Sequence, residues 1–274
     1  MYANTMAAPI RTAPLATAAG TRPDPAAVDW TALATAITGW SRDLGFAEVG
    51  ISDTELAAEE ARLVAWLDAG RHGRMDYMAR HGVTRARPAA LVPGTLRVIS
   101  VRMDYLPPGA RAAGAVLADP ELAYVARYAL GRDYHKVMRQ RLQRLATRIR
   151  DEIGDFGHRV FTDSAPVLEV ALAVKAGLGW RGKHTLLLTR DRGSHFFLGE
   201  IYTDLPLPPT PPVSAHCGTC TACLDACPTG AIVAPYELDA RLCISYLTIE
   251  LDGPIPEPLR PLARTTPSGP GRIS

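Results

Sequence analysis

Four cysteines lie at the spacing that binds an iron–sulfur cluster. The stretch HCGTCTACLDACPTGAI contains Cys217, Cys220, Cys223 and Cys227, and Pro228 follows at once. In a C-x2-C-x2-C-x3-C-P run, the first three thiolates bind one [4Fe–4S] cluster and the fourth binds the other cluster of a pair. Structural zinc uses two separated pairs of ligands, so a zinc site is the weaker alternative. The spacing therefore predicts an iron–sulfur centre.

The chain supplies fewer thiolates than a pair of clusters needs. Each cubane takes four, and the sequence has five cysteines, of which Cys243 is the last. A second run is expected downstream, but the chain closes with LARTTPSGPGRIS, which has no apolar periodicity and is rich in Pro, Gly, Ser and Thr. We expect a truncation or a change of reading frame near Leu262.

Composition indicates an ordinary globular protein. The 274 residues are 47% hydrophobic and 21% charged, enough for one large domain or two smaller ones. The net charge of +2 is compatible with a nucleic-acid partner without arguing for one. No apolar run approaches the roughly 20 residues of a membrane span, and the N-terminus lacks the apolar core of a secretory signal. Clustered thiols indicate a reducing compartment, hence the cytoplasm, rather than a disulfide framework.

Apolar periodicity predicts the helices and strands that must position the cysteine run. Helical spacing marks residues 30–44, with Asp29 as the N-cap, and residues 55–70, closed by Gly70. The clearest helix lies at 133–154. The remaining predictions are strands at 46–52 and 96–106, a strand, turn and helix over 159–180, and a hairpin made by 184–189 and 194–203 around RDRG.

The polar side of the helix at 133–154 is strongly basic. A row of like charges is typical of a solvated helix face, and we favour that interpretation over an RNA-binding strip. The cations are Lys136, Arg139, Arg141, Arg144, Arg148 and Arg150.

Four segments together resemble the epoxyqueuosine reductase family. They are GTLRVISVRMDYLP, GRDYHKVMRQRL, DSAPVLEVALAVKAGLGWRGKHTLLLT and CGTCTACLDACPTGAI followed by YELDARLCISYLTIE. The resemblance covers about residue 30 to about residue 261, and DSAPVLE followed by GLGWRGK is its most specific part. It implies reduction of the epoxide on a modified base, at the wobble position of tRNA, to the alkene of queuosine.

The resemblance also implies cofactors, partners and architecture. The cofactors are a cobalamin and two [4Fe–4S] clusters that pass electrons to it. The partners are a tRNA with a queuosine-type wobble base and an unidentified electron donor, without a membrane, and we expect a monomer. The fold class is α+β, with an N-terminal cobalamin-binding α/β sandwich-type domain and a small ferredoxin-like iron–sulfur lobe whose second half is incomplete.

These implications divide the chain into five parts. We expect a disordered leader at 1–28, the cobalamin-binding catalytic domain at 29–204, a proline-rich linker at 205–214, a partial 4Fe–4S lobe at 215–261 and a disordered tail at 262–274.

Asp163 matches the proton donor of the family. From the residues alone, DSAP followed by Glu169 favours a helix N-cap at Asp163. The resemblance reverses that preference and leaves the cap to Ser164. A carboxylic acid can protonate a departing epoxide oxygen if apolar surroundings raise its pKa.

The resemblance further implies residues that contact the cofactors. Arg87 is the less secure of these, because Arg85 could be aligned in its place. For His135 we favour a hydrogen-bonded histidine at a helix start over a ligand of cobalt. The predicted cofactor-binding residues are Arg87, Tyr128, Asp133, Tyr134, His135, Gly179, Lys183, His184 and Ser245. The predicted metal ligands are Cys217, Cys220, Cys223, Cys227 and Cys243.

A second hypothesis shares every motif upstream of the cysteine run. In it, the chain is a truncated, catalytically impaired cobalamin-binding remnant that fails at electron delivery. A simple electron-transfer ferredoxin is the weakest alternative, because about 200 residues before the cysteines are unnecessary for it.

Overall fold

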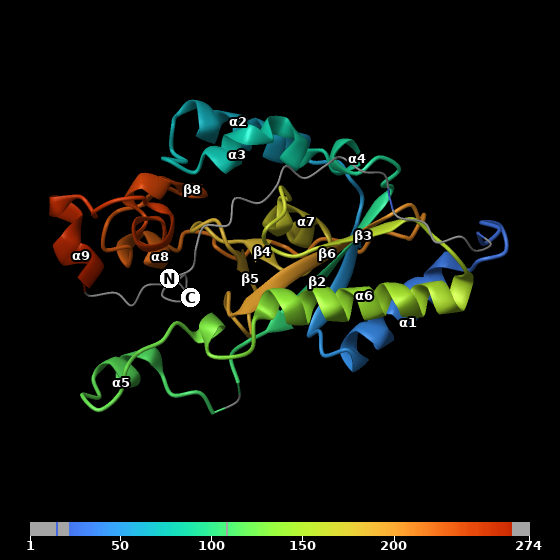
Figure 1. The fold of residues 1–274 in the computed structure, drawn as a ribbon, viewed down its shortest axis with the longest axis horizontal. Coiled ribbons are helices and arrows are strands. Elements are labelled where there is room, and N and C mark those ends of the chain that lie inside the picture. Colours follow the sequence, from blue (N-terminus) through green and yellow to red (C-terminus); the bar gives the residue numbers. More distant parts are fainter. Residues whose placement is uncertain (1–14, 16–21, 108, 265–274) are drawn as a thin grey trace.

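A four-stranded antiparallel sheet forms the centre of the protein (Figure 1). The computed structural model describes residues 15, 22–107 and 109–264. The two central strands pair from Arg97 opposite Thr203 to Asp104 opposite Phe196. In spatial order the strands are β1 (Glu48–Ser52), β2 (Arg97–Asp104), β6 (Phe196–Thr203) and β3 (His158–Phe161).

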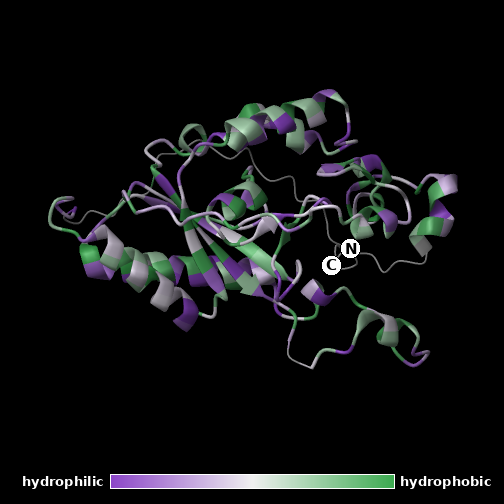
Figure 2. Cartoon of the chain, turned by 180° about the vertical axis from the view of Figure 1, so that it is seen from behind, coloured by the Kyte–Doolittle hydropathy of each residue, from purple (hydrophilic) through white to green (hydrophobic). Residues whose placement is uncertain are grey.

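Two long helices cover one face of this sheet, α1 (Trp30–Asp43) and α6 (Tyr134–Ile153). Hydrophilic and hydrophobic residues alternate along the helices that flank the sheet (Figure 2). The inward stripe of α6 is fully buried, and its members are Met138, Leu142, Leu145 and Ile149. These elements confirm the predicted helices and strands. The apolar spacing of α6 allowed it only one buried face, whereas the central strand β2 is buried on both faces.

Side-chain contacts fix both helices. The carboxylate of Asp29 accepts hydrogen bonds from the backbone N–H groups of Thr31 and Ala32, which confirms the predicted cap. Two arginines of α6 serve contacts within the chain. Arg141 donates to the carbonyl oxygen of Gly45 at 2.9 Å, and Arg148 lies 3.0 Å from Asp43.

The other face of the sheet carries the short helix α7 (Glu169–Lys175) and a mixture of apolar and polar side chains. Leu172 of α7 is fully buried against this face. Ser100, Glu200 and Tyr202 are buried there as well, although each is polar. Buried polar groups need hydrogen-bond partners, so this face differs in kind from the face covered by α1 and α6.

The remaining elements surround this core. A helical cap lies over the α7 side, and a separate lobe holds the C-terminal elements (Figure 1). The cap consists of α2 (Ala57–Asp68), α3 (Asp76–Arg80), η1 (Gly82–Ala86) and α4 (Pro88–Leu91). An excursion between β2 and α6 holds α5 (Ala113–Leu117) and η2 (Arg127–Ala129). The lobe contains α8 (Ala222–Asp225), β7 (Ile232–Ala234), β8 (Glu237–Leu238), η3 (Ala240–Leu242), η4 (Tyr246–Glu250), η5 (Glu257–Leu259) and α9 (Arg260–Arg264).

The hairpin predicted around RDRG is wrong. The segment before it, β5 (Leu187–Leu188), pairs with β4 (Trp180–Arg181), and the turn itself is closed by a single bridge between Thr189 and Gly193. The segment after it, β6, lies between β2 and β3. Both edges of β6 are therefore taken by other strands, which sequence spacing alone does not reveal.

The proline-rich segment at 205–214 runs along the core. Leu205 and Leu207 are buried among the residues of the α1–α6 side. Thr210 and Ile51 exchange two hydrogen bonds, at 2.8 and 3.0 Å. Of the predicted leader and tail, residues 1–14, 16–21 and 265–274 lie outside the described residues. Within the described residues, no helix combines the length and the apolar character needed to cross a membrane.

Candidate active site

The loop between β3 and α7 holds Asp163 in an unusual backbone conformation. Its φ is 54°, in the left-handed region that non-glycine residues seldom adopt. The Asp163 N–H donates to Oε1 of Glu169 at 2.7 Å. The residue that precedes α7 is Leu168, and no side chain caps the helix. The N-cap interpretations of Asp163 and Ser164 are therefore wrong, and Glu169 binds back to the loop instead.

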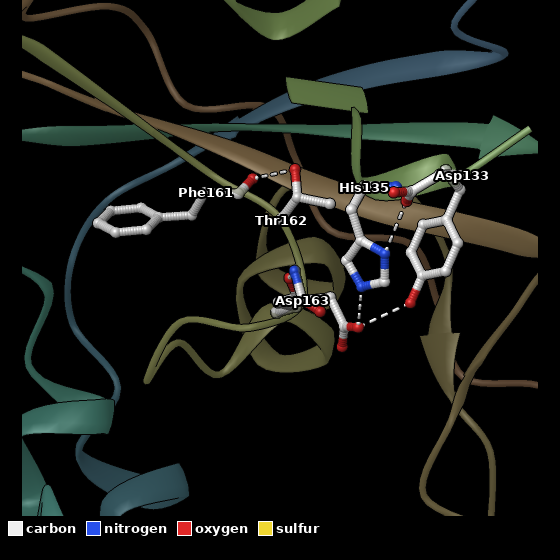
Figure 3. A network of polar contacts seen from close by, with 7 residues as sticks. Asp133, His135, Phe161, Thr162 and Asp163 are labelled. Carbon is white, nitrogen blue, oxygen red and sulfur yellow. Dashed lines mark hydrogen bonds and ion pairs between the residues drawn. The ribbon is translucent and has the colours of Figure 1, made fainter. Parts of the chain in front are cut away.

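The Asp163 carboxylate meets two residues from the start of α6 (Figure 3). Its Oδ2 accepts a hydrogen bond from the Tyr134 hydroxyl at 2.6 Å and lies 2.7 Å from Nε2 of His135. The other ring nitrogen of His135 lies 3.1 Å from Oδ1 of Asp133. Asp133 also caps α6 by accepting the His135 N–H. The interpretation of His135 as a hydrogen-bonded histidine at a helix start is confirmed.

The hydrogen-bonding pattern around His135 depends on where its protons lie. A neutral imidazole has one donor and one acceptor nitrogen, whereas ionised carboxylates only accept. His135 faces carboxylate oxygens of Asp133 and Asp163 on both sides. Both contacts are hydrogen bonds only if the ring is doubly protonated or Asp163 carries a proton. The geometry therefore leaves a place for one shared proton between His135 and Asp163.

The surroundings of Asp163 differ from those that the sequence suggested. Its side chain is 54% exposed, and it lies beside an imidazole and a phenol rather than in an apolar pocket. Burial and the hydrogen bond to Asp163 raise the pKa of Tyr134 well above its usual range. For Asp133, burial acts to raise the pKa, but hydrogen bonds from the side chain and backbone of His135 outweigh it and lower the pKa.

Tyr128 lies close to this group. Its ring packs edge-on against Tyr134, with the centroids 6.4 Å apart, and Tyr134 also stacks on Phe197 at 4.0 Å. Tyr128 and Tyr134 line a cavity of about 640 Å³ together with arginines of the α5 excursion and of the β5–β6 turn. The structure thus brings Tyr128, Tyr134 and Asp163 together.

Arg87 lies elsewhere. Its guanidinium makes two hydrogen bonds to Glu60 of α2, at 2.7 and 2.6 Å, in a separate cavity between α2 and the start of α4. These bonds raise the pKa of Arg87 and lower that of Glu60. The alternative residue, Arg85, is buried and donates to the carbonyl oxygens of Tyr77 and Met78. Neither arginine lies in the cavity beside Tyr134.

Contacts within the chain explain the residue types in and next to the GLGWRGK turn. A Cβ on Gly179 would collide with the Leu188 carbonyl oxygen across the β4–β5 pair. His184 is buried, its Nδ1 accepts the Leu186 N–H at 3.1 Å, and burial lowers its pKa. Lys183 donates to the carbonyl oxygens of Gly218 and Cys220, both at 2.8 Å. The turn therefore holds the first part of the cysteine run.

The five cysteines fall into three environments. The charges of Cys217 and Cys220 act together with burial, the larger cause, to raise the pKa of Cys223. Cys227 stands apart: its sulfur accepts the Ala231 N–H at 3.3 Å. Burial acts to raise the pKa of Cys227, but hydrogen bonds led by the Ile232 amide lower it. The separate environment of Cys227 agrees with the spacing, which assigns the first three cysteines to one cluster and the fourth to another.

The last cysteine belongs to the small core of the C-terminal lobe. Cys243 packs beside Tyr246, whose hydroxyl accepts the Arg74 N–H from the helical cap at 2.9 Å. Ser245 lies between them in the chain, and its carbonyl faces the Thr248 hydroxyl. Across residues 15, 22–107 and 109–264, no three His, Cys, Asp or Glu side chains converge closely enough to hold a single metal ion. A cubane presents separate irons to its ligands, so its cysteines need not converge on one atom.

Sequence reasoning missed a third cavity, of about 730 Å³. It lies between α2, α7, the β4–β5 turn and the β7–β8 hairpin, and Glu169 and Arg181 line it. Thr185 and Tyr236 also line it, with φ values of 76° and 69°. Together with Asp163 they are the non-glycine residues with positive φ in the described part of the chain. Such strain concentrates at functional sites, but no motif in the sequence signals it.

Two family models match the chain. One is described as epoxyqueuosine reductase QueG, DUF1730, over residues 85–164, and the other as a 4Fe-4S double cluster binding domain over residues 216–269. The second match supports the predicted iron–sulfur lobe.

Curated epoxyqueuosine reductases are similar in sequence. The protein of Burkholderia pseudomallei is 64% identical over 84% of this chain and 62% of its own length. That of Pseudomonas aeruginosa is 65% identical, with 88% and 65% covered, and that of Escherichia coli is 59% identical, with 86% and 62% covered. The chain thus spans a little under two thirds of the length of these relatives.

Solved epoxyqueuosine reductases share the fold. A crystal structure with an epoxyqueuosine-modified tRNA-Tyr stem loop has a TM-score of 0.74 at 26% identity, covering 85% of this chain and 61% of that one. The Bacillus subtilis enzyme, solved with its catalytic aspartate loop swung out of the active site, has a TM-score of 0.71 at 26% identity, with the same coverage. Over the residues that it spans, the chain belongs to the epoxyqueuosine reductase family.

Proposed function

We propose that this chain reduces epoxyqueuosine to queuosine in tRNA, with Asp163 delivering a proton to the epoxide oxygen. The observation that carries the proposal is the Asp163 carboxylate, held by Tyr134 and His135 on a strained loop. The names of the relatives support the reaction. The Bacillus subtilis structure supports the idea that a loop with an aspartate is catalytic in this family.

The reaction consumes protons that the array can supply. Converting an epoxide to an alkene and water takes two electrons and two protons. Both C–O bonds break, and without protonation the oxygen would depart as a poor alkoxide leaving group. Asp163 donates the first proton, and His135, at 2.7 Å, returns one to it. Tyr134 keeps the carboxylate oriented through its 2.6 Å hydrogen bond.

The cysteine run suits an iron–sulfur cluster. Cys217, Cys220 and Cys223 would bind one cluster, and Cys227 with Cys243 would contribute to another. The influence of Cys217 and Cys220 on the pKa of Cys223 fits a shared cluster. When bound, the clusters would supply electrons from an external donor.

Cobalamin is the proposed second cofactor. It would supply two-electron reducing power at the substrate carbon. The cavity lined by Glu169, Arg181, Thr185 and Tyr236 fits this role, because strained backbone and the cysteine lobe both border it. In this proposal, residues 29–204 form the catalytic domain and residues 215–261 the electron-delivering lobe, in a cytoplasmic monomer.

The tRNA is proposed to approach the cavity beside Tyr134. Arg127, Arg132 and Arg192 line it together with Tyr128, so cations for phosphates and a ring for base stacking lie side by side. The structure solved with a tRNA stem loop shows that a relative with this fold binds such a substrate.

The test is turnover by the anaerobically reconstituted chain. Iron, sulfide and cobalt per chain are measured first. After incubation with the chain, epoxyqueuosine-containing tRNA is digested to nucleosides, and the wobble nucleoside is identified by mass spectrometry. We expect queuosine from the wild type and none from Asp163→Asn, which should still bind tRNA and cobalamin. A fully loaded wild type that makes no queuosine would overturn the proposal, and a fully active Asp163→Asn would overturn the role of Asp163.

A further inference from the structure

A glutamate is buried in the middle of the sheet. Glu200 occupies the centre of β6, opposite Ser100 on one side and Phe161 on the other, and its exposed fraction is 0%. Among the described residues, neither of its carboxylate oxygens has a hydrogen-bond donor. An ionised carboxylate without donors costs several kcal/mol in such a site, so this side chain must be protonated or must share a proton.

The neighbour of Glu200 is another carboxyl group. Glu169 begins α7 on the same face of the sheet and is half-buried. The two groups lie within hydrogen-bonding reach of each other, and a bond between carboxyl groups exists only when one of them carries a proton. Burial, and then the charge of Glu169, raise the pKa of Glu200 well above its usual range. Glu200 is the more completely buried of the two, so it is the partner that keeps the proton.

Glu169 also accepts a hydrogen bond from the loop that carries Asp163. Its Oε1 accepts the Asp163 N–H at 2.7 Å. The φ of 54° at Asp163 needs such a restraint, because this conformation costs a non-glycine residue on the order of 1 to 3 kcal/mol. A chain of contacts thus runs from Glu200 through Glu169 to the Asp163 backbone.

We propose that Glu169 is a positioning residue, which, when hydrogen-bonded by a protonated Glu200, holds the Asp163 loop so that its carboxylate meets Tyr134 and His135. This inference rests on the proposed function only in treating Asp163 as the proton donor. The loop geometry that it explains is independent of turnover. No chemical step is assigned to either glutamate.

The pair makes the loop sensitive to pH. Burial raises the pKa of Glu169 to about 7, and the charge of Asp163 acts in the same direction. The other titratable groups that face the pair are Tyr134 of α6, Tyr202 of β6 and Arg181 of β4, the last of which is paired with Glu59 of α2. Once the shared proton leaves, two adjacent carboxylates repel each other. Glu169 becomes an ionised acceptor above about pH 7, whereas Glu200 keeps the shared proton until its own raised pKa is passed. The restraint on Asp163 is therefore expected to hold through pH 7 and to weaken only at higher pH.

The test uses hydrogen exchange of the Asp163 amide in the purified full chain, followed by mass spectrometry across pH. In the wild type, protection beyond the intrinsic rate should hold through pH 7 and fall at the higher pH where Glu200 loses its proton. Glu169→Ala removes the acceptor and should lose about tenfold in protection at pH 6, the value of one hydrogen bond of about 1.4 kcal/mol. Glu200→Gln donates an N–H that cannot ionise, so protection should persist to pH 9. Glu152→Ala, at an exposed position of α6, is the matched control.

Two outcomes overturn the inference. One is wild-type protection of Asp163 in Glu169→Ala. The other is a pH dependence in Glu200→Gln identical to that of the wild type. Since the Gln variant is isosteric, misfolding does not confuse the second result. If exchange behaves as expected but no queuosine forms, the positioning role stands and the proposed function fails. In an active protein, Glu169→Ala should lower kcat and leave KM for tRNA unchanged.

Discussion

The ammonium group of Lys183 lies 2.8 Å from the carbonyl oxygen of Cys220. A second contact of the same length joins it to Gly218, so one buried cation binds two carbonyl groups of the cysteine loop. Lys183 belongs to the turn after β4, next to the cavity that contains Thr185 and Tyr236. The sheet domain and the metal-binding loop are thereby fixed to each other at one side chain.

Replacing that cation should loosen the cysteine loop. Lys183→Met keeps the aliphatic stem and removes two charge-assisted hydrogen bonds, each worth about 1.5 to 3 kcal/mol. We expect less iron per chain after reconstitution and faster loss of iron to a chelator. Lys136→Met is the control, because Lys136 is 85% exposed on α6. Equal iron retention in both variants would contradict a role for Lys183 in the loop.

His135 should matter for proton supply rather than for binding. His135→Gln cannot return a proton to Asp163, so kcat is expected to fall by about 100-fold, within the range of general acid–base effects. The KM for tRNA should change little. Single-turnover assays with a chemical reductant measure both. His158→Gln is the matched control: His158 lies on β3 beside Gln143, outside the Asp163 group. A fall of the same size in the control would show a general loss of structure.

The pair of Glu169 and Glu200 should make stability depend on pH. The folded-state pKa of Glu169 is raised from 4.5 to about 7, so its contribution is fully present below about 4.5 and is lost as the pH rises through about 7. Glu200 is shifted in the same direction. Glu200→Gln should therefore gain stability relative to the wild type between pH 5 and pH 8, on the order of 1 to 3 kcal/mol. Urea unfolding at the two pH values measures this difference, and Glu152→Gln should show none.

The cavity beside Tyr134 should contribute to tRNA binding through phosphates. Arg127→Gln with Arg132→Gln should weaken binding and reduce the slope of log affinity against log salt by about 1 to 2. Arg144→Gln, on the exposed side of α6, should leave the slope unchanged. Filter binding at several salt concentrations distinguishes the two surfaces. A loss confined to Arg144→Gln would favour the RNA-binding strip on α6 over the cavity.

The amino-acid sequence by itself determined the elements and the type of chemistry. The stripe of Met138, Leu142 and Ile149 could be buried only by a helix. The cysteine spacing indicated an iron–sulfur lobe, which the match over residues 216–269 supports. These features are local: periods of 3.6 or 2 residues and fixed ligand spacings are properties of one segment and need no distant partner.

Only the tertiary structure decided how separate segments combine. The sequence favoured a helix cap at Asp163, yet the loop instead places its carboxylate against residues of α6, about 30 positions earlier. Arg87 is hydrogen-bonded to Glu60, and Lys183 is hydrogen-bonded to the cysteine loop. The burial of Glu200 depends on β6 lying between β2 and β3. Each of these outcomes depends on which distant residue a polar side chain contacts. Such a contact leaves no periodic pattern in the sequence, so the sequence alone does not identify the partner.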